Sequence, residues 1–175
     1  MNNDDILNQR TLLQLRKPAD LFGEVSYALN ELTVSRKEST SLILIHVYVD
    51  DLFLNSYWAD GLIIATPTGS TAYSLSCGGP IVSPGSENFL ISPIATHNLT
   101  VRPVVIRDDS VIRIQLEGRD TSYFASLDSR SVSIGAENEL LISKSDFKMN
   151  LVQMKNKTFF TTIRDKLNWG LDKRN

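Results

Sequence analysis

Residues 60–80 form the part of the chain that is richest in groups able to contact a polar ligand. An apolar run over 61–66 leads into a Pro-Thr-Gly turn and then into a stretch with several hydroxyl side chains. Gly69 allows the backbone to turn tightly or to approach a ligand closely. Ser70 or Thr71 can cap a following helix, whose free N–H groups and dipole favour an anion or a polar ligand edge.

Two further features of this segment could contact a ligand. Tyr73 offers an aromatic face for a base or a ring, and Gly78 with Gly79 allows a second close approach of the backbone. The plain alternative is a strand–turn–helix corner whose hydroxyl groups only cap the helix, and local chemistry alone favours that alternative. The segment is not a Walker-type phosphate loop, because no lysine follows its glycine.

A polar pair, Asn30 and Glu31, interrupts an apolar run over residues 27–34 that we predict to be a strand. Alternation along a strand points one of the two side chains inward, where it needs polar partners. A carboxylate beside an amide can accept and donate hydrogen bonds to a vicinal diol such as a ribose. The alternative is an edge strand with Glu31 in solvent, and the pattern leaves both open.

Short β-branched runs, separated by Pro, Gly, Ser, Asn and Asp, dominate the rest of the chain. The predicted strands cover residues 27–34, 42–49, 52–57, 61–66, 88–92, 99–101, 104–106, 111–116, 122–126, 132–134, 140–143 and 147–151. Their spacing favours a sandwich, and the lack of alternating helices disfavours a parallel α/β sheet. We therefore expect a mainly β, multi-stranded β-sandwich-like domain with one short internal helix and a C-terminal amphipathic helix.

The internal helix is predicted over residues 70–77 and the other near the C-terminus. Apolar residues four apart place one face of the C-terminal helix toward a neighbour; they are Phe159, Ile163, Leu167 and Leu171. Thr162 with Asp165 resembles a capping box, and Gly170 is a suitable stop. By default this helix packs on its own domain, and the alternative is that it docks on a domain outside this chain.

The composition is that of an ordinary globular domain, with 42% of the 175 residues hydrophobic and 22% charged. Lys and Arg number eighteen against twenty Asp and Glu, for a net charge of -2, so general nucleic-acid binding is disfavoured. The single cysteine and two histidines exclude an internal disulfide and disfavour a structural metal. The acidic start predicts no signal peptide, and no run reaches the ~18 apolar residues of a membrane span, so we expect a cytoplasmic protein without a membrane partner.

The run over 60–80 resembles the signature of the NAD kinases, which phosphorylate the 2′-hydroxyl of the adenosine ribose of NAD to make NADP. Asn30-Glu31 resembles the Asn-Glu motif of that family, thirty residues before Asp60. Other similar segments are 93–97 with Leu99, Arg102-Pro103, Ser126-Leu127-Asp128 and 164–170. The resemblance covers nearly the whole chain, from about residue 10 to residue 170.

One family motif has no counterpart here. The family has a Gly-Gly-Asp-Gly motif in an N-terminal α/β domain, and its aspartate is taken to be the base, whereas the only Asp-Gly pair of this chain is Asp60-Gly61. The chain is therefore similar to the C-terminal, NAD-binding half, and we predict no catalytic residue in it. The expected organisation is a lead-in over 1–20, an all-β NAD-binding domain over 21–155, and a helical segment over 156–175 that returns to the missing N-terminal domain. The chain is then either a truncation or a stand-alone fragment.

The resemblance implies roles for the residues of both motifs. Asn30 and Glu31 would hold the adenosine ribose hydroxyls, and Asp60 would accept a hydrogen bond from an amide or amino group of NAD, in a site that subunits could share. The wall of the NAD site would be formed by Thr71, Ala72, Tyr73, Ser74 and Ser76.

Four residues remain open between a functional and a structural role. Trp58 stands where many members have a basic residue and could stack on a ring, and Arg130 stands where a glutamine is common and could reach a phosphate. Both could equally face solvent. His97 could lie near the acceptor, although a structural histidine is the simpler interpretation, and Cys77 is expected to be a small packing residue.

The resemblance implies phosphoryl transfer from ATP or polyphosphate, in which positioning and charge neutralisation supply most of the catalysis. A divalent metal, Mg²⁺, would be coordinated by the phosphates of ATP, and no tightly bound cofactor is expected in this chain. The resemblance also implies that the protein forms a homodimer or a homotetramer. One alternative is a non-catalytic NAD-binding or oligomerisation module. Another is a relative of the diacylglycerol and sphingosine kinases, which residues 66–73 match less well than they match the NAD kinases.

Overall fold

The computed structural model describes residues 5–37, 42–118, 122–154 and 157–168. One six-stranded sheet contains β1 (Asp5–Lys17), β2 (Tyr27–Ala28), β4 (Ile43–Val49), β5 (Leu52–Ala59), β9 (Ile112–Glu117) and β12 (Leu140–Met154). The other contains β3 (Glu31–Arg36), β6 (Gly61–Ala65), β7 (Asn88–Ile94), β8 (Val104–Arg107), β10 (Tyr123–Leu127) and β11 (Arg130–Ile134). A 3-10 turn, η1 (Gly69–Thr71), and two helices, α1 (Tyr73–Ser76) and α2 (Phe159–Leu167), complete the described elements.

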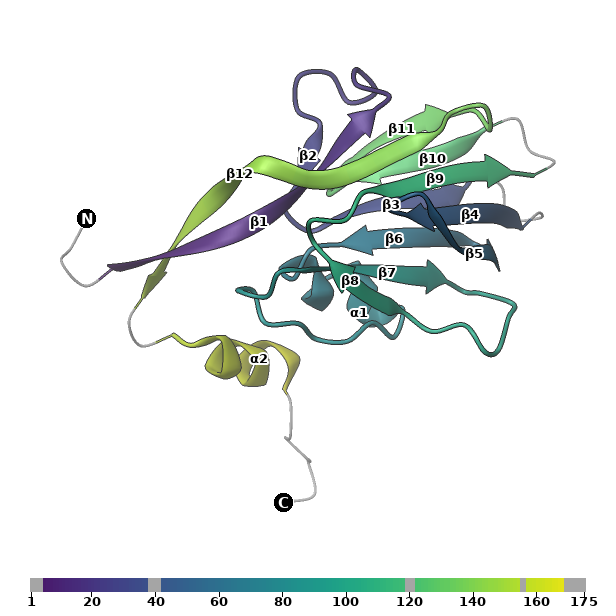
Figure 1. The fold of residues 1–175 in the computed structure, drawn as a ribbon. Coiled ribbons are helices and arrows are strands. Elements are labelled where there is room, and N and C mark those ends of the chain that lie inside the picture. Colours follow the sequence, from purple (N-terminus) through teal and green to yellow (C-terminus); the bar gives the residue numbers. More distant parts are fainter. Residues whose placement is uncertain (1–4, 38–41, 119–121, 155–156, 169–175) are drawn as a thin grey trace.

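The two sheets form a sandwich, which confirms the predicted mainly β fold (Figure 1). The strand order is β2-β1-β12-β9-β4-β5 in the first sheet and β11-β10-β3-β6-β7-β8 in the second. Every pairing of neighbouring strands is antiparallel. Antiparallel neighbours need no crossover helix, in agreement with a sequence in which helices do not alternate with the predicted strands.

The core between the sheets is built by alternate residues of each strand. In β4, Ile43, Ile45 and Val47 are fully buried, whereas the residues between them are partly exposed. All five residues of β6 are buried, as the continuous apolar run predicts, because β3 and β7 flank it and α1 lies on its outer side. The same helix stands next to the hydroxyl-rich bend.

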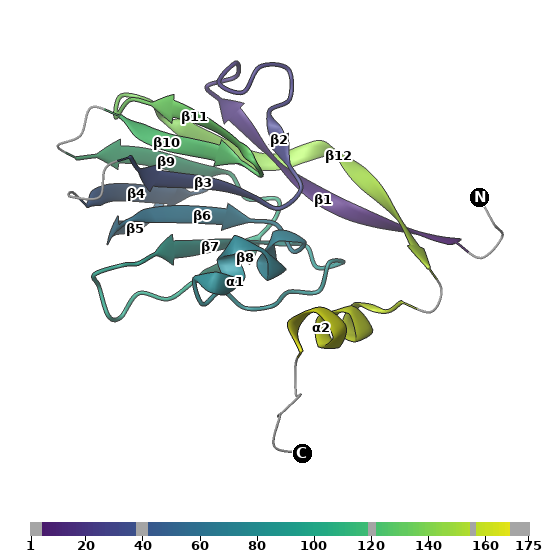
Figure 2. The ribbon, with the colours of Figure 1, turned by 180° about the vertical axis from the view of Figure 1, so that it is seen from behind.

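A long ribbon of β1 and β12 extends beyond the sandwich (Figure 2). β1 occupies residues for which no strand is predicted, and the two strands predicted over 140–143 and 147–151 are one continuous strand. The pattern misses β1 and the continuity of β12 because only the inner part of the ribbon faces the core. Leu12 and Leu13 are fully buried there, whereas Leu7 and Val152, farther out, are exposed.

Two other predicted strands differ from the structure. The run over 27–34 is split at Leu29 and Asn30, where the chain leaves the first sheet and enters the second. Residues 99–101 form no strand, because the side chain of Asn98 accepts hydrogen bonds from the backbone N–H and the hydroxyl of Thr100 and so stabilises a turn.

The predicted caps of both helices are wrong. Ser70 and Thr71 donate their hydroxyls to the carbonyls of Pro67 and Thr68 and so support the turn before α1. The capping box of α2 is formed by Thr158 and Thr161, each side chain bonded to the backbone N–H of the other, and not by Thr162 and Asp165. The helix ends at Leu167, followed by a left-handed residue 168, and the predicted residues 170 and 171 lie outside the described part of the chain. Neither described helix is long and apolar enough to cross a membrane.

Candidate functional site

The two motifs singled out in the sequence lie side by side. β3 and β6 are neighbours, with Glu31 opposite Ala65. Just beyond that pair, the backbone N–H of Thr66 donates to the carbonyl of Asn30 at 2.8 Å, and its hydroxyl donates to the carbonyl of Leu29 at 2.5 Å. The Asn-Glu pair and the start of the bend are therefore one corner of the fold.

Gly69 is required at this corner for steric reasons. A Cβ at this position would collide with the backbone carbonyl of Asn30. The atoms in the way are backbone atoms, which cannot move aside as a flexible side chain could. The glycine of the bend is therefore explained by the close approach of the other motif.

A cavity of about 390 Å³ opens beside this corner on the outer face of the second sheet. Its lining residues are Glu31, Thr33, Ser35, Arg36, Asp60, Tyr73, Ile94, Ser126 and Asp128. Alternate residues of β3 face it, while Leu32 and Val34 between them point into the core. The structure thus brings Glu31, Asp60 and Tyr73 together in one cavity.

Asp60 is the single residue that joins β5 in one sheet to β6 in the other. Its backbone N–H donates to the carbonyl of Ile94 at 2.9 Å, and its carbonyl accepts from the N–H of Arg36 at 3.0 Å. The guanidinium of Arg36 also donates to Oδ2 of Asp60 at 3.0 Å. This ion pair balances the charge of Asp60 at the wall of the cavity, and sequence reasoning missed it because the two residues meet only through strand pairing.

Glu31 presents a half-buried carboxyl group to the cavity. Its Oε2 atom is buried and has no hydrogen-bond partner among the described residues. Burial, and secondly the negative charge of Asp128, raise the pKa of Glu31 to about 7. Near neutral pH this group can therefore donate as well as accept a hydrogen bond, which suits a hydroxyl ligand.

Tyr73 stands between this cavity and a second hollow of about 750 Å³. Ser76, Cys77, Thr96 and Arg102 are among the residues that line the second hollow. The Tyr73 side chain is exposed, and it lines both spaces, so an elongated ligand could extend across it. Burial raises the pKa of the Cys77 thiol, which keeps it protonated and unreactive, as the packing role predicts.

The other residues predicted for the wall lie in different environments. Thr71 is exposed and Ala72 is half-buried at the start of α1. Ser74 is fully buried and shares a hydrogen bond of 2.9 Å with Ser92, so its hydroxyl faces the protein interior and not a ligand. Ser76 is exposed at the second hollow.

Trp58, Arg130 and His97 are not among the residues that line the two spaces. The guanidinium of Arg130 donates to the backbone carbonyls of Val25 and Tyr27, so it stabilises the chain around β2. Trp58 is exposed on the edge strand β5, and its carbonyl accepts from the N–H of the exposed His97 at 3.1 Å. This geometry favours the structural interpretation of Arg130.

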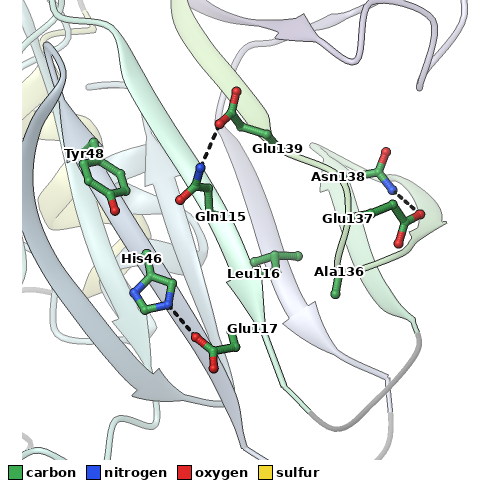
Figure 3. A pocket seen from close by; sticks show the side chains of 9 residues that line it. All are labelled: His46, Tyr48, Gln115, Leu116, Glu117, Ala136, Glu137, Asn138 and Glu139. Carbon is green, nitrogen blue, oxygen red and sulfur yellow. Dashed lines mark hydrogen bonds and ion pairs between the residues drawn. The ribbon is translucent and has the colours of Figure 1, made fainter.

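A separate hollow of about 530 Å³ lies over β4 and β9 in the first sheet (Figure 3). His46 is held there between Ser56, at 2.7 Å from Nδ1, and Glu117, at 3.0 Å from Nε2. Glu117 shares the lining with Glu137 and Glu139. Three carboxylates make this hollow unsuitable for a ligand that carries phosphate groups.

Comparison with known proteins identifies the family of the chain. The model of the ATP-NAD kinase C-terminal domain matches residues 29–154. The NAD kinase of Cytophaga hutchinsonii is 50% identical over 97% of this chain and 58% of its own length. The NAD kinase of Flavobacterium johnsoniae is 51% identical over 100% of this chain and 60% of its own length. The chain thus spans about three fifths of the length of these curated relatives.

Solved structures show the same fold. The yeast NADH kinase complexed with NADH matches with a TM-score of 0.84 and 26% identity, over 95% of this chain and 51% of that one. An NAD kinase from Archaeoglobus fulgidus in complex with ATP matches with a TM-score of 0.77 and 28% identity, over 93% of this chain and 60% of that one. These matches confirm the family that the motifs indicate: the chain belongs to the ATP-NAD kinase family and corresponds to its C-terminal domain.

Proposed function

We propose that this chain is the NAD-binding part of an NAD kinase, which transfers a phosphoryl group from ATP or polyphosphate to the 2′-hydroxyl of the adenosine ribose of NAD. The observation that supports this most is the meeting of Glu31, Asp60 and Tyr73 in one cavity beside the Gly69 corner. These residues come from the two motifs that the family resemblance assigns to NAD. The structure of the yeast relative holds NADH and that of the Archaeoglobus fulgidus relative holds ATP.

Each residue of the corner has a chemical role in this proposal. Glu31, with its unpaired buried oxygen, and Asn30 beside it hold the ribose hydroxyls. Asp60 accepts a hydrogen bond from an amide or amino group of NAD, while the guanidinium of Arg36 holds its carboxylate in place. The exposed ring of Tyr73 forms the wall, together with Thr71, Ala72 and Ser76.

Catalysis by this part of the enzyme is positioning of the acceptor. Fixing the ribose against Glu31 reduces the entropic cost of bringing its hydroxyl in line with a donor phosphate. The proton of that hydroxyl passes to a base outside this chain, the aspartate of the Gly-Gly-Asp-Gly motif in the N-terminal domain. We place Mg²⁺ on the phosphates of the donor, where it would neutralise charge.

The N-terminal domain docks, in this proposal, on the groove between α2 and the β1–β12 ribbon. The groove has a volume of about 830 Å³ and is lined by apolar, neutral polar and basic side chains, among them Arg10, Phe160 and Lys166. Phe160 is 69% exposed, and Ile163 is the one buried residue of α2. Arg10, Lys157 and Lys166 give the groove positive charge, which an acidic surface of the docked domain would complement.

The edge strand β5 carries exposed apolar side chains that another subunit could cover. Leu52, Phe53 and Trp58 are exposed on β5, which is an edge strand of the first sheet. Apolar side chains on an open edge favour contact with another chain, which supports a homodimer or homotetramer. We expect the protein to act in the cytoplasm, where NAD and ATP are both present.

The proposal is tested with the chain alone and fused behind the N-terminal domain of the Cytophaga hutchinsonii relative. We expect the chain alone to bind NAD in a calorimeter without making NADP, and the fusion to make NADP from NAD, ATP and Mg²⁺. NAD binding without turnover by the fusion would favour a non-catalytic binding module. Turnover by the chain alone would contradict the placement of the base, and no binding by either protein would contradict the proposed function.

A further inference from the structure

Asp128 is the residue most closely connected to the Asn-Glu pair, although the motifs assign it no role. Its carboxylate accepts hydrogen bonds from three successive backbone N–H groups. Oδ2 lies 2.9 Å from the nitrogen of Leu29, and Oδ1 lies 2.8 Å from that of Asn30 and 3.2 Å from that of Glu31. In return, the N–H of Asp128 donates to the carbonyl of Glu31 at 3.0 Å.

These hydrogen bonds pair the backbone N–H groups of a segment that has no partner strand of its own. Leu29 and Asn30 cross from β2 in the first sheet to β3 in the second, so they belong to no strand. Buried backbone groups outside a ladder need other partners. Thr66 supplies donors to the two carbonyls, and Asp128 supplies acceptors to the N–H groups.

The conformation of Asp128 is suited to this contact. It follows β10 in the tight hairpin to β11, with a positive φ of 51°. Residues other than glycine rarely adopt this region, and aspartate is one of the few that tolerate it. Because β10 pairs with β3, with Leu127 opposite Leu32, the hairpin places the carboxylate directly at the crossover.

We propose that Asp128 is a positioning residue for the ribose-binding pair: its carboxylate fixes the crossover and thereby the direction in which Asn30 and Glu31 leave the backbone. The same contact keeps the carbonyl of Asn30 against Gly69, so one carboxylate orders both halves of the corner. The inference rests on the proposed function, because the pair is assigned to NAD.

The carboxylate also acts on Glu31 through its charge. Both groups line the same cavity, in which Arg36, Asp60 and Tyr73 are the other titratable residues. Asp128 is the second cause of the raised pKa of Glu31, after burial. Removing this charge should therefore lower the pKa of Glu31, but only part of the way to its ordinary value, because burial remains.

The test uses Asp128→Gly, with Asp50→Gly as the matched control. Glycine adopts a positive φ without strain, so the hairpin can still form while the carboxylate is lost. Asp50 has the same φ of 51° in the hairpin between β4 and β5, and its Oδ1 accepts from the N–H of Val111 at 2.8 Å. It lies at the first sheet and does not line the cavity.

Three measurements are made on the full chain. By NMR, we expect the amides of residues 29–31 to exchange at least tenfold faster in Asp128→Gly than in wild type or Asp50→Gly. The carboxyl titration of Glu31 should move downward from about 7 in Asp128→Gly alone. Calorimetry with NAD should show at least tenfold weaker binding by Asp128→Gly and a change within twofold for Asp50→Gly.

Unchanged exchange at residues 29–31 would overturn the proposal whatever NAD does. Faster exchange with unchanged NAD affinity would show that the contact is structural only, and would also overturn it. A wild-type chain that binds no NAD would instead contradict the proposed function. The exchange and the Glu31 titration would then decide the inference by themselves, and an unchanged Glu31 midpoint would refute it.

Discussion

Replacing Gly69 by alanine perturbs the corner at the place where its two halves touch. The added methyl group would meet the carbonyl oxygen, the carbonyl carbon and the Cα of Asn30. None of these atoms belongs to a side chain, so relief requires movement of the bend away from β3. That movement also strains the hydrogen bond from the Thr66 N–H to the carbonyl of Asn30.

The expected cost follows from the size of the clash. Forcing an extra methyl group into a well-packed site costs about 1–3 kcal/mol, and for a domain of this size each kcal/mol lowers Tm by roughly 2–4 °C. We therefore expect Gly69→Ala to lower Tm by roughly 4–8 °C, for a loss of about 2 kcal/mol. NAD affinity should fall at least tenfold, because Asn30 and Glu31 shift with the crossover.

The matched control is Gly85→Ala, since a Cβ at residue 85 would meet no atom within 4 Å. Thermal unfolding followed by circular dichroism gives Tm for both variants, and calorimetry gives the NAD affinity. Gly85→Ala should stay within about 0.5 kcal/mol of wild type. If Gly69→Ala were as stable as Gly85→Ala and bound NAD equally well, the close approach of the two motifs would be wrong.

Three other predictions test the charges and the docking groove. The pKa of Glu31 in the folded chain lies above its ordinary value of 4.5, so the stability contributed by its protonated form is complete below pH 4.5 and is lost as the pH rises through about 7. In urea titrations Glu31→Gln should therefore gain stability relative to wild type between pH 5 and pH 8. A difference that stays constant with pH would contradict this. Asp60→Ala should weaken NAD binding by about 1–3 kcal/mol in calorimetry, because the partner group is left unpaired, and an unchanged affinity would remove Asp60 from the site. Phe160→Ser should leave Tm of the chain alone within about 2 °C but lower that of the fusion with the N-terminal domain, because the side chain is exposed only without its partner; equal effects on both proteins would argue against docking at this groove.

The parts of the fold that sequence reasoning predicts are those whose burial leaves a clear pattern in the sequence, either alternation between core and solvent or a continuous apolar run. β4 shows this pattern and β6 shows continuous burial, and both were predicted within two residues of their ends. The β1–β12 ribbon depends instead on backbone hydrogen bonds between segments more than a hundred residues apart. Such pairing places few demands on side-chain type, so periodicity reveals neither β1 nor the continuity of β12.

The site shows a similar division. The family resemblance, together with the local chemistry of the two motifs, predicts Glu31, Asp60 and Tyr73, which line one cavity. Sequence reasoning gives no role to Arg36, or to Asp128 although it stands in a segment that resembles the family, because each reaches the site only through the register of β3 with β6 and β10. An aspartate at a two-residue hairpin was a usable signal for Asp128, since aspartate favours such turns, but its target at residues 29–31 depends on the three-dimensional fold.

The most direct measurement is a crystal structure of the chain soaked with NAD. We predict that the adenosine ribose hydroxyls lie within hydrogen-bond distance of the Glu31 carboxyl, with the rest of the dinucleotide passing Tyr73 toward the second hollow. Density for NAD in the acidic hollow around His46, or anywhere out of contact with both Glu31 and the Gly69 bend, would contradict it.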